Sequence, residues 1–333
     1  MKKRIAINGF GRIGRSCLKV ILEHPDLELV AVNDLMVMEN AVYLLRHDTI
    51  YGKYEKNISI VDGKITIDKH AITYLSQSNP ELLPWKSLMV DIVIESTGIF
   101  TNQSDAEKHI DAGAKIVVIS GPAKDTPTVV YGVNTKEGRH PIFSCGSCTT
   151  NNISPLMEIL GRRIGIKKAI LNTTHAYTAS QSLVDAPNKR EPRMGRTAGQ
   201  NLAPARTGAA IATTKVLPDY VEKFDGVAVR VPVAVGSISD LTFIAARATT
   251  VKEINEILID EAHSIRYYEV LAVTEEPLVS TDIIKSDYAA IIDLEMTRVV
   301  DGDLVKIMSW YDNEWGFTNQ MIRQILSIPD YCE

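Results

Sequence analysis

The sequence has few cysteines, no long apolar run and little net charge, and each shortage excludes a class of protein. Four cysteines in 333 residues are too few for a disulfide framework, which indicates a reducing, cytoplasmic location. No apolar run reaches the roughly 18 residues that span a bilayer, so no membrane partner is expected. The net charge of −5 gives no electrostatic footprint for nucleic acid. The basic start at Met1–Arg4 leads into a strand rather than a signal-peptide segment.

Metal-binding patterns are scarce as well. Cys145 and Cys148 form a C-x-x-C pair, but no second such pair and no paired histidines accompany them, so no metal site is expected. The content of 45% hydrophobic and 23% charged residues is ordinary for a folded globular protein. A chain of this length usually holds two domains, because single cores rarely grow past about 250–300 residues.

The N-terminal part carries a glycine-rich motif between two apolar strands. Residues 3–8 are expected to form a strand, Gly9-Phe-Gly-Arg-Ile-Gly14 follows at once, and a predicted helix leads to a strand at 27–33 that ends in Asp34. This order is the dinucleotide-binding fingerprint. The glycines let backbone approach a pyrophosphate, and the helix N-terminus stabilises the phosphate charge. Asp34 would accept hydrogen bonds from the adenosine ribose and repel a 2′-phosphate, which favours NAD over NADP.

Further apolar segments continue this pattern as a parallel, helix-covered sheet. The expected elements are a helix at 105–112 and strands at 58–61, 64–67, 71–74, 91–95 and 115–120. Ligands of such sheets bind at the carboxyl ends of the strands, so Thr97 and Ser120 are candidate cofactor-binding residues. Hydroxyls in such loops are equally common as turn formers.

A cysteine near the middle of the chain opens another predicted helix. In Ser147-Cys-Thr-Thr-Asn151 the thiol of Cys148 faces unpaired helix N–H groups and the positive end of the dipole, both of which favour the thiolate. The alternative is a small buried cysteine under a Ser/Thr cap. A nucleophilic role requires a base and a group that holds the oxyanion.

The second half of the chain offers partners for this thiol. His175 lies in the strand expected at 169–177, directly after the cysteine helix, although a histidine there is often structural. Arg230 lies in an apolar strand at 226–232, where an arginine demands an anion. Small donors suited to phosphate oxygens are Thr150, Thr178, Thr207 and Gly208.

The remaining elements predict an α+β second domain on a mixed or antiparallel sheet. They are strands at 239–246, 270–273 and 305–311, a helix at 251–265 and a final helix at 314–326. The polar stretch at 178–203 is long enough to be a functional loop.

These motifs resemble the phosphorylating glyceraldehyde-3-phosphate dehydrogenases from end to end. The matching segments are Ile7-Asn-Gly-Phe-Gly-Arg-Ile-Gly-Arg15, Val32-Asn-Asp34, Glu95-Ser-Thr-Gly98, Ser147-Cys-Thr-Thr-Asn151, His175-Ala-Tyr-Thr178, Thr207-Gly-Ala-Ala210, Val229-Arg-Val-Pro232 and Ser309-Trp-Tyr-Asp-Asn-Glu-Trp-Gly316. The resemblance implies a Rossmann-type NAD-binding domain at 1–148, completed by a C-terminal helix at 314–333, and a catalytic domain at 149–313. It also implies a homotetramer in which the loop after Thr178 reaches a neighbouring subunit's cofactor.

The resemblance further implies an NAD-dependent oxidation of D-glyceraldehyde 3-phosphate, in glycolysis and gluconeogenesis. Inorganic phosphate would give 1,3-bisphosphoglycerate through a hemithioacetal and a thioester on Cys148, with His175 as base. The substrate-phosphate site would be Thr178 and Arg230, and the inorganic-phosphate site Ser147, Thr207 and Gly208, with Thr149 and Thr150 beside them. The cofactor contacts would be Gly9, Phe10, Gly11, Arg12, Ile13, Asp34, Thr97, Ser120 and Asn313, the last at the nicotinamide carboxamide.

The chain departs from the family's pattern at several positions. Cys145 stands where asparagine is usual and Asn152 where cysteine is usual, so the second thiol near Cys148 has changed its position. A disulfide between Cys145 and Cys148 would require Cα atoms about 6 Å apart. Arg206 replaces a small hydroxyl; it either supplies charge to a phosphate pocket or is a solvated arginine. Ala186-Pro187 keeps half of a signature of NAD-specific relatives.

Two other functions compete with this interpretation. Erythrose-4-phosphate dehydrogenase has the same fold, but that branch tends to lack the His-Ala-Tyr-Thr segment found here at His175. A non-catalytic NAD-binding interaction protein is the alternative from another class. The joint presence of Cys148, His175 and Arg230 argues against it.

Overall fold

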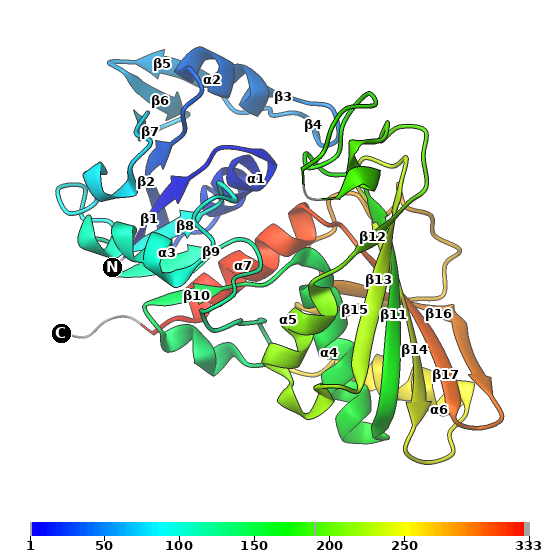
Figure 1. Ribbon diagram of the computed structural model, residues 1–333. Helices are drawn as coiled ribbons and strands as arrows, with labels where there is room; N and C mark the ends of the chain where they lie inside the picture. Colours follow the sequence, from blue (N-terminus) through cyan, green and yellow to red (C-terminus); the bar gives the residue numbers. More distant parts are fainter. Residues whose placement is uncertain (1, 190, 330–333) are drawn as a thin grey trace. The chain divides into compact units, whose positions relative to one another are not determined.

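The computed structural model describes residues 2–189 and 191–329 and divides into two compact units (Figure 1). The first holds the described residues up to 129 together with 135–146 and 321–329, and the second holds 130–134 and 147–320. The last helix, α7 (Trp315–Ser327), contributes residues to both units. Residues 330–333 of the helix expected at 314–333, with Cys332 among them, lie outside the described residues.

The first unit is built on an eight-stranded sheet in the order β10-β9-β8-β1-β2-β7-β6-β5. The pairs from β10 to β7 are parallel, as the nucleotide-binding pattern predicts. The strands are β1 (Lys3–Asn8), β2 (Leu27–Asn33), β5 (Ile58–Val61), β6 (Lys64–Ile67), β7 (His70–Leu75), β8 (Ile92–Glu95), β9 (Ile116–Ile119) and β10 (Ile142–Ser144). The helices are α1 (Arg12–Ile21), α2 (Met38–Arg46) and α3 (Gln103–Asp111), and a two-stranded sheet joins β3 (His47–Asp48) to β4 (Gly52–Lys53).

The outer strands correct the prediction that this sheet is parallel throughout. β5 pairs antiparallel with β6, and β6 pairs antiparallel with β7. Only Asp62-Gly63 and Asp68-Lys69 connect them, whereas a parallel crossover needs about a dozen residues. Asp62, Gly63 and Asp68 have φ angles of 50°, 71° and 50°, which suit tight hairpin turns.

The second unit carries a seven-stranded mixed sheet in the order β12-β13-β11-β14-β17-β16-β15. β11 pairs parallel with β13 and β15 with β16, and the other pairs are antiparallel. The strands are β11 (Ile166–Ala176), β12 (Ala203–Arg206), β13 (Phe224–Val231), β14 (Ser237–Ala245), β15 (Leu271–Thr274), β16 (Ala290–Val300) and β17 (Leu304–Tyr311). The strand β16 was not predicted from the sequence, because its polar and charged residues interrupt the alternation; its pairing shifts register between Asp293 and Arg298.

Helices cover one face of this second sheet (Figure 1). They are α4 (Cys148–Arg163), α5 (Ala209–Val216) and α6 (Val251–Ala262). The apolar positions of α4, such as Leu156 and Leu160, pack with strand residues such as Leu241 and Ile307 in one buried core. This core holds the start of α4 against the ends of the strands. Short 3-10 helices span Pro80–Leu82, Thr135–Arg139, Pro192–Gly195 and Pro218–Tyr220.

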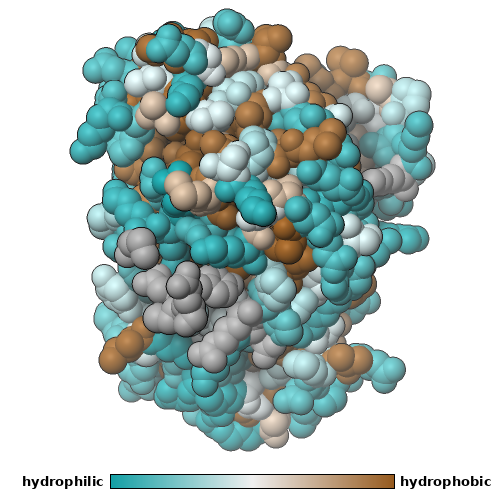
Figure 2. Space-filling model, turned by 90° about the vertical axis from the view of Figure 1, so that its left-hand side faces the viewer, coloured by the Kyte–Doolittle hydropathy of each residue, from teal (hydrophilic) through white to brown (hydrophobic). Residues whose placement is uncertain are grey.

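Within the described ranges, no helix is both long and apolar enough to cross a membrane. Figure 2 shows the face on the left-hand side of Figure 1, where hydrophilic side chains predominate and hydrophobic ones occur in scattered groups.

Candidate active site

The cysteine at the middle of the chain is the first residue of α4. Ser147 is the N-cap, and its hydroxyl oxygen accepts a hydrogen bond from the Thr150 N–H at 3.1 Å. The hydroxyl groups of Ser147 and Thr150 are 2.8 Å apart and share a second hydrogen bond. The capping pattern that predicts a helix start here therefore fixes the backbone beside Cys148.

Cys148 and His175 are in contact. Cys148 is half-buried, and its Sγ lies 3.4 Å from Nε2 of the buried His175, near the end of β11. A thiol and an imidazole at this distance are placed for proton transfer between them. The structure thus favours the nucleophile interpretation over that of an isolated buried thiol.

Arg230 reaches the other side of the same imidazole. β11 and β13 run parallel with His175 opposite Arg230, and the Arg230 Nη1 lies 2.7 Å from His175 Nδ1. The carbonyl of Ala176 lies 2.7 Å from that same Nδ1. A guanidinium only donates, so next to Arg230 the Nδ1 accepts and the ring proton sits on Nε2. When Nδ1 donates to Ala176 instead, Nε2 is free to take the thiol proton.

Electrostatics keep both groups of this pair neutral. Burial and, after it, the charge of Arg230 together lower the pKa of His175 to about 3, although the hydrogen bond to the Ala176 carbonyl acts in the opposite direction. Burial raises the pKa of the Cys148 thiol, although Arg230 and the N–H of Thr149 act in the opposite direction. The N–H groups at the helix N-terminus lower the pKa of the thiol, as the sequence predicts, but desolvation outweighs them and the net pKa is raised.

Tyr311 is a residue of this site that the sequence analysis did not assign. Its buried hydroxyl group lies 2.9 Å from Thr149 Oγ1 and 2.8 Å from Thr173 Oγ1. Its ring meets the ring of His175 edge-on, with centroids 5.9 Å apart. Thr149, expected near the substrate, thus directs its hydroxyl to Tyr311. The one sequence signal for Tyr311 was its place in the segment Ser309–Gly316.

Asn313 is held by groups that neighbour the histidine strand. Its side-chain oxygen accepts from Ser237 Oγ at 3.0 Å and from the Gly236 N–H at 3.2 Å. Ser237 Oγ also accepts from the Ala176 N–H at 3.1 Å. These bonds leave the amide nitrogen of Asn313 as the end that can donate to a ligand.

The remaining predicted phosphate residues have other partners among the described residues. The Thr178 hydroxyl lies 2.9 Å from Ser180 Oγ, in the loop after β11. Thr207 Oγ1 accepts from the Ala209 N–H at 3.1 Å, and Gly208 is the N-cap of α5. Arg206 is exposed at the end of β12, which favours a solvated arginine. Cys145 and Cys148 are not joined by a disulfide.

The first unit carries a separate groove of about 500 Å³ at the carboxyl ends of its parallel strands. Of the predicted cofactor residues, Gly9, Gly11, Asp34 and Thr97 line it. The lining also includes Asn8, Asn33, Leu35, Gln77, Ser78, Ser96, Ile99 and Phe100, which the sequence analysis did not assign. Each of these residues ends or follows a strand, so its position at the carboxyl end of a strand is the sequence signal that could have identified it.

The glycines of this groove have distinct geometric roles. Gly9 has a φ of +96°, and a Cβ there would lie 2.6 Å from the Thr97 nitrogen. A Cβ on Gly14 would lie 2.1 Å from the Gly9 carbonyl oxygen. A Cβ on Gly11 would meet no atom within 4 Å, so this backbone borders open space. Since no side chain caps the α1 N-terminus, its amides can receive a pyrophosphate.

Asp34 closes the other side of the groove. Its carboxylate accepts from the Phe10 N–H at 2.6 Å and from the Met36 N–H at 2.9 Å. Arg12 turns to Asp48 at 2.8 Å, and the backbone N–H of Ser120 donates to the Glu95 carbonyl. Ile13 lies one residue into α1. Open glycine backbone, an uncapped helix and a fixed carboxylate are the features that NAD requires.

Comparison with known proteins supports both halves of this description. Residues 3–103 match the model of the glyceraldehyde 3-phosphate dehydrogenase NAD-binding domain, and residues 147–313 match the model of the C-terminal domain of the same enzyme. The chain belongs to the glyceraldehyde-3-phosphate dehydrogenase family. Its first-unit groove is thus in the NAD-binding domain of that family, and NAD is its cofactor.

Proteins named glyceraldehyde-3-phosphate dehydrogenase are similar to this chain over nearly its full length. The protein of Streptomyces coelicolor is 45% identical over 327 residues, which is 97% of each chain. That of Thermotoga maritima is 43% identical over 324 residues, 96% of this chain and 97% of its own. That of Clostridium acetobutylicum is 40% identical over 329 residues, 97% of each.

Proposed function

We propose that this member of the family catalyses the NAD-dependent oxidative phosphorylation of D-glyceraldehyde 3-phosphate in glycolysis and gluconeogenesis. The observation that carries the proposal is the contact of 3.4 Å between Cys148 Sγ and His175 Nε2 at the start of α4. When bound, NAD supplies the acceptor for the hydride that leaves the aldehyde carbon. The groove lined by Gly9, Gly11 and Asp34 would hold its adenosine and pyrophosphate.

In the first half of the reaction, Cys148 Sγ forms a bond to the aldehyde carbon and gives a hemithioacetal. The thiol proton passes to His175 Nε2, which then donates a hydrogen bond to the new oxygen. Loss of the hydride from the same carbon, with the hydroxyl proton returned to His175, leaves a thioester on Cys148. Asn313 would hold the nicotinamide carboxamide through its amide nitrogen.

In the second half, an oxygen of inorganic phosphate attacks the thioester carbon. The carbon–sulfur bond breaks, so the acyl phosphate leaves and Cys148 is released as a thiolate. We assign the substrate phosphate to Arg230 and Thr178, and inorganic phosphate to Ser147, Thr207 and Gly208, with Thr149 and Thr150 beside them. A phosphate on Arg230 would give its guanidinium an anionic partner and free His175 Nδ1 to donate to the Ala176 carbonyl.

The proposal is tested by NADH formation, followed at saturating NAD with glyceraldehyde 3-phosphate. We expect turnover that depends on inorganic phosphate and is much faster than turnover with erythrose 4-phosphate. Preference for erythrose 4-phosphate would assign the chain to that neighbouring activity. No NADH from either aldehyde would favour the non-catalytic interpretation.

Asp34 should determine the choice between NAD and NADP. Replacing it with serine removes a charged acceptor for the ribose hydroxyls, so we expect KM for NAD to rise about 10- to 100-fold. The ratio of kcat/KM for NAD to that for NADP should fall, because the repulsion of a 2′-phosphate is also lost. Steady-state kinetics with both dinucleotides measure this ratio. An unchanged ratio would contradict the role given to Asp34.

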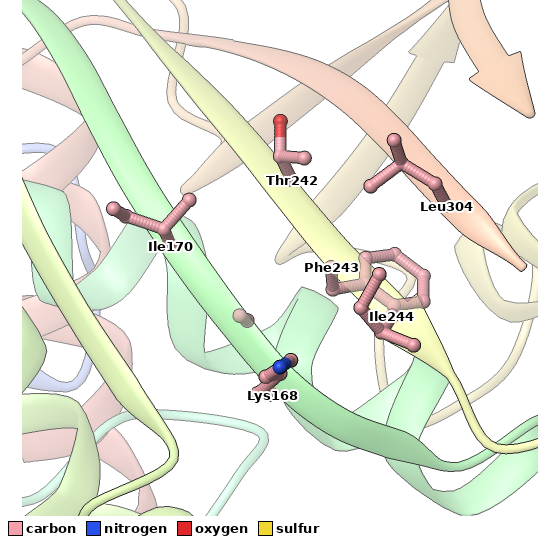
Figure 3. Close-up of a pocket in the computed structure, with 7 residues that line it drawn as sticks. Lys168, Ile170, Thr242, Phe243, Ile244 and Leu304 are labelled. Atoms are coloured by element: carbon pink, nitrogen blue, oxygen red, sulfur yellow. The ribbon is translucent and has the colours of Figure 1, made fainter. Parts of the chain in front are cut away.

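The family resemblance implies a homotetramer, and one sheet face supports an interface of that assembly. The face of the second sheet opposite the helices exposes Ile170, Val227 and Leu304, whose exposed fractions are 57%, 52% and 38%. Figure 3 shows Ile170, Thr242 and Leu304 on the neighbouring strands β11, β14 and β17. They line a shallow depression of about 260 Å³. Apolar side chains gathered on one face are typical of an interface.

A charge on this face should weaken the assembly. Sedimentation of the wild-type protein should give the mass of four 36.8-kDa chains, and Ile170→Lys should shift it to smaller species. Ile265→Lys is the matched control, because Ile265 is fully exposed after α6, away from this face. A tetramer that survives Ile170→Lys would contradict the assignment of this interface.

We also propose a cytoplasmic location, because four cysteines in 333 residues are too few for a disulfide framework, which suits a reducing compartment. The functional domains are proposed as 1–148 with 314–333 for NAD and 149–313 for catalysis.

A further inference from the structure

Beneath the cofactor groove of the first unit lies a chain of buried polar side chains that the mechanism does not use. Glu95 ends β8, Asn8 ends β1, and His109 lies on α3. Glu95 and Asn8 are each 1% exposed, and His109 and Trp85 are fully buried. A carboxylate so deep in the protein is costly unless donors surround it.

The direction of each hydrogen bond follows from groups that have one role only. The backbone N–H of Gln77 donates to Asn33 Oδ1 at 2.9 Å, so the Asn33 amide nitrogen is the end that donates to Asn8 Oδ1, at 2.7 Å. The amide nitrogen of Asn8 is thereby left to donate to Glu95 Oε2, at 2.6 Å. The chain of bonds fixes both amide orientations without any free choice.

The same reasoning fixes the protonation of His109. The indole N–H of Trp85 can only donate, and it lies 2.9 Å from His109 Nδ1. Nδ1 is therefore an acceptor, and the ring proton sits on Nε2, which lies 3.2 Å from Glu95 Oε2. His109 is thus a neutral donor to Glu95.

The second oxygen of Glu95 holds the loop that borders the groove. The Thr97 N–H donates to Glu95 Oε1 at 2.8 Å, and the Thr97 hydroxyl donates to the same oxygen. The Thr97 hydroxyl oxygen accepts from the Ile99 N–H at 3.1 Å. Both Glu95 oxygens face donors, so the group is a carboxylate, and the Thr97 hydroxyl proton is not free for the cofactor.

These contacts connect the two sides of the groove. Five residues that line it lie on separate strands: Asn33 ends β2 and Gln77 follows β7, whereas Thr97, Ile99 and Phe100 follow β8, which lies beyond β1 in the sheet. The ring of Phe100 also meets the His109 ring edge-on, at 6.4 Å. The backbone around Gly98 turns with a φ of +72°, and the Glu95 contacts hold this turn in place.

We propose that Glu95 and His109 are positioning residues for NAD: the buried Glu95 carboxylate fixes the loop at residues 96–100, and neutral His109 fixes the carboxylate. The proposal rests on NAD occupying this groove. Neither residue lines the groove, so both act through Thr97 and its neighbours. The role of His109 requires an acceptor toward Trp85 and a donor toward Glu95.

Two variants of His109 separate this role from packing. His109→Gln can present an amide oxygen to Trp85 and an amide N–H to Glu95, so we expect its NAD dissociation constant within about threefold of wild type. His109→Leu loses both bonds, and Glu95→Gln places an N–H opposite other donors. For both we expect NAD binding, measured by calorimetry on the free protein, to weaken about 10-fold or more.

A buried variant at a residue that does not line the groove provides the control for lost stability. Ile65→Ala on β6 removes a fully buried side chain, so its melting temperature should fall without a change in NAD affinity. If His109→Leu and Glu95→Gln bind NAD as tightly as Ile65→Ala, the cluster is structural only and the proposal is overturned. Equal loss in His109→Gln and His109→Leu also overturns it. Wild-type protein that fails to bind NAD would instead overturn the cofactor assignment.

A spectroscopic measurement gives the same answer without any variant. Nitrogen-15 NMR of the wild-type protein should show His109 as the Nε2–H tautomer under the conditions of the binding measurement. A His109 that is doubly protonated, or that carries its proton on Nδ1, contradicts the bond directions on which the proposal depends.

Discussion

Replacing Cys148 with serine is expected to lower kcat/KM for glyceraldehyde 3-phosphate by roughly 10⁴- to 10⁶-fold, measured as NADH formation with phosphate present. A serine hydroxyl stays protonated at neutral pH and cannot be activated by the weak base that suffices for a thiol. No other side chain in contact with His175 Nε2 among the described residues is a nucleophile that can replace it. The reaction would therefore lose its covalent intermediates.

Two measurements make this result specific. Cys145→Ala removes the other thiol of the C-x-x-C pair, which is buried in the first unit, and should leave kcat within about twofold of wild type. The NAD dissociation constant of Cys148→Ser should match that of the wild-type protein, because the groove is lined by first-unit residues. More than a tenth of wild-type activity in Cys148→Ser would show that another group is the nucleophile.

The nucleotide groove was predictable because its geometry is encoded within one short segment. The roles of Gly9, Gly11 and Gly14 depend on local backbone conformation, and the motif's spacing fixes that conformation. Asp34 follows the next strand, so the topology of the fold brings it to the Phe10 N–H. In this region the apolar strands, the glycine motif and the helix pattern all predict the same fold.

The contacts around His175 were less accessible to sequence analysis. That Cys148 and His175 meet follows from a helix that returns directly into a strand. The contact of Arg230 with His175 depends on the parallel register of β11 and β13, which no local pattern encodes. Tyr311 lies 162 residues from its partner Thr149, and its importance is visible only when the sheet is assembled.

Two differences between the expectations and the structure have identifiable physical causes. The antiparallel pairing of β5 with β6 and of β6 with β7 follows from the length of their connections, which is two residues each. The apolar pattern of the strands predicts the strands themselves but not the direction in which they pair. The expectation of a thiolate at Cys148 counted the helix N–H groups but not desolvation, and burial depends on the packing of the whole second unit.

Replacing His175 with asparagine is expected to lower kcat by about 10²- to 10⁴-fold, the usual contribution of a positioned general base. Burial and the charge of Arg230 lower the pKa of His175 to about 3, so the imidazole is neutral at physiological pH; when its Nδ1–H donates to the Ala176 carbonyl, Nε2 can accept the thiol proton. An asparagine amide has no basic nitrogen. Single-turnover measurement of NADH formation and the rate of Cys148 alkylation by iodoacetamide should both fall.

Tyr311→Phe separates this base chemistry from the orientation of the ring. Phenylalanine keeps the edge-on contact with His175 but loses the hydroxyl contacts to Thr149 and Thr173, so kcat should fall by less than about tenfold. If His175→Asn fell no further than Tyr311→Phe, proton transfer to His175 would not limit the reaction. A large loss in His175→Asn alone means that the thiol proton passes from Cys148 Sγ to His175 Nε2. The reactivity of the thiol at the start of α4 then depends on His175 more than on the helix dipole.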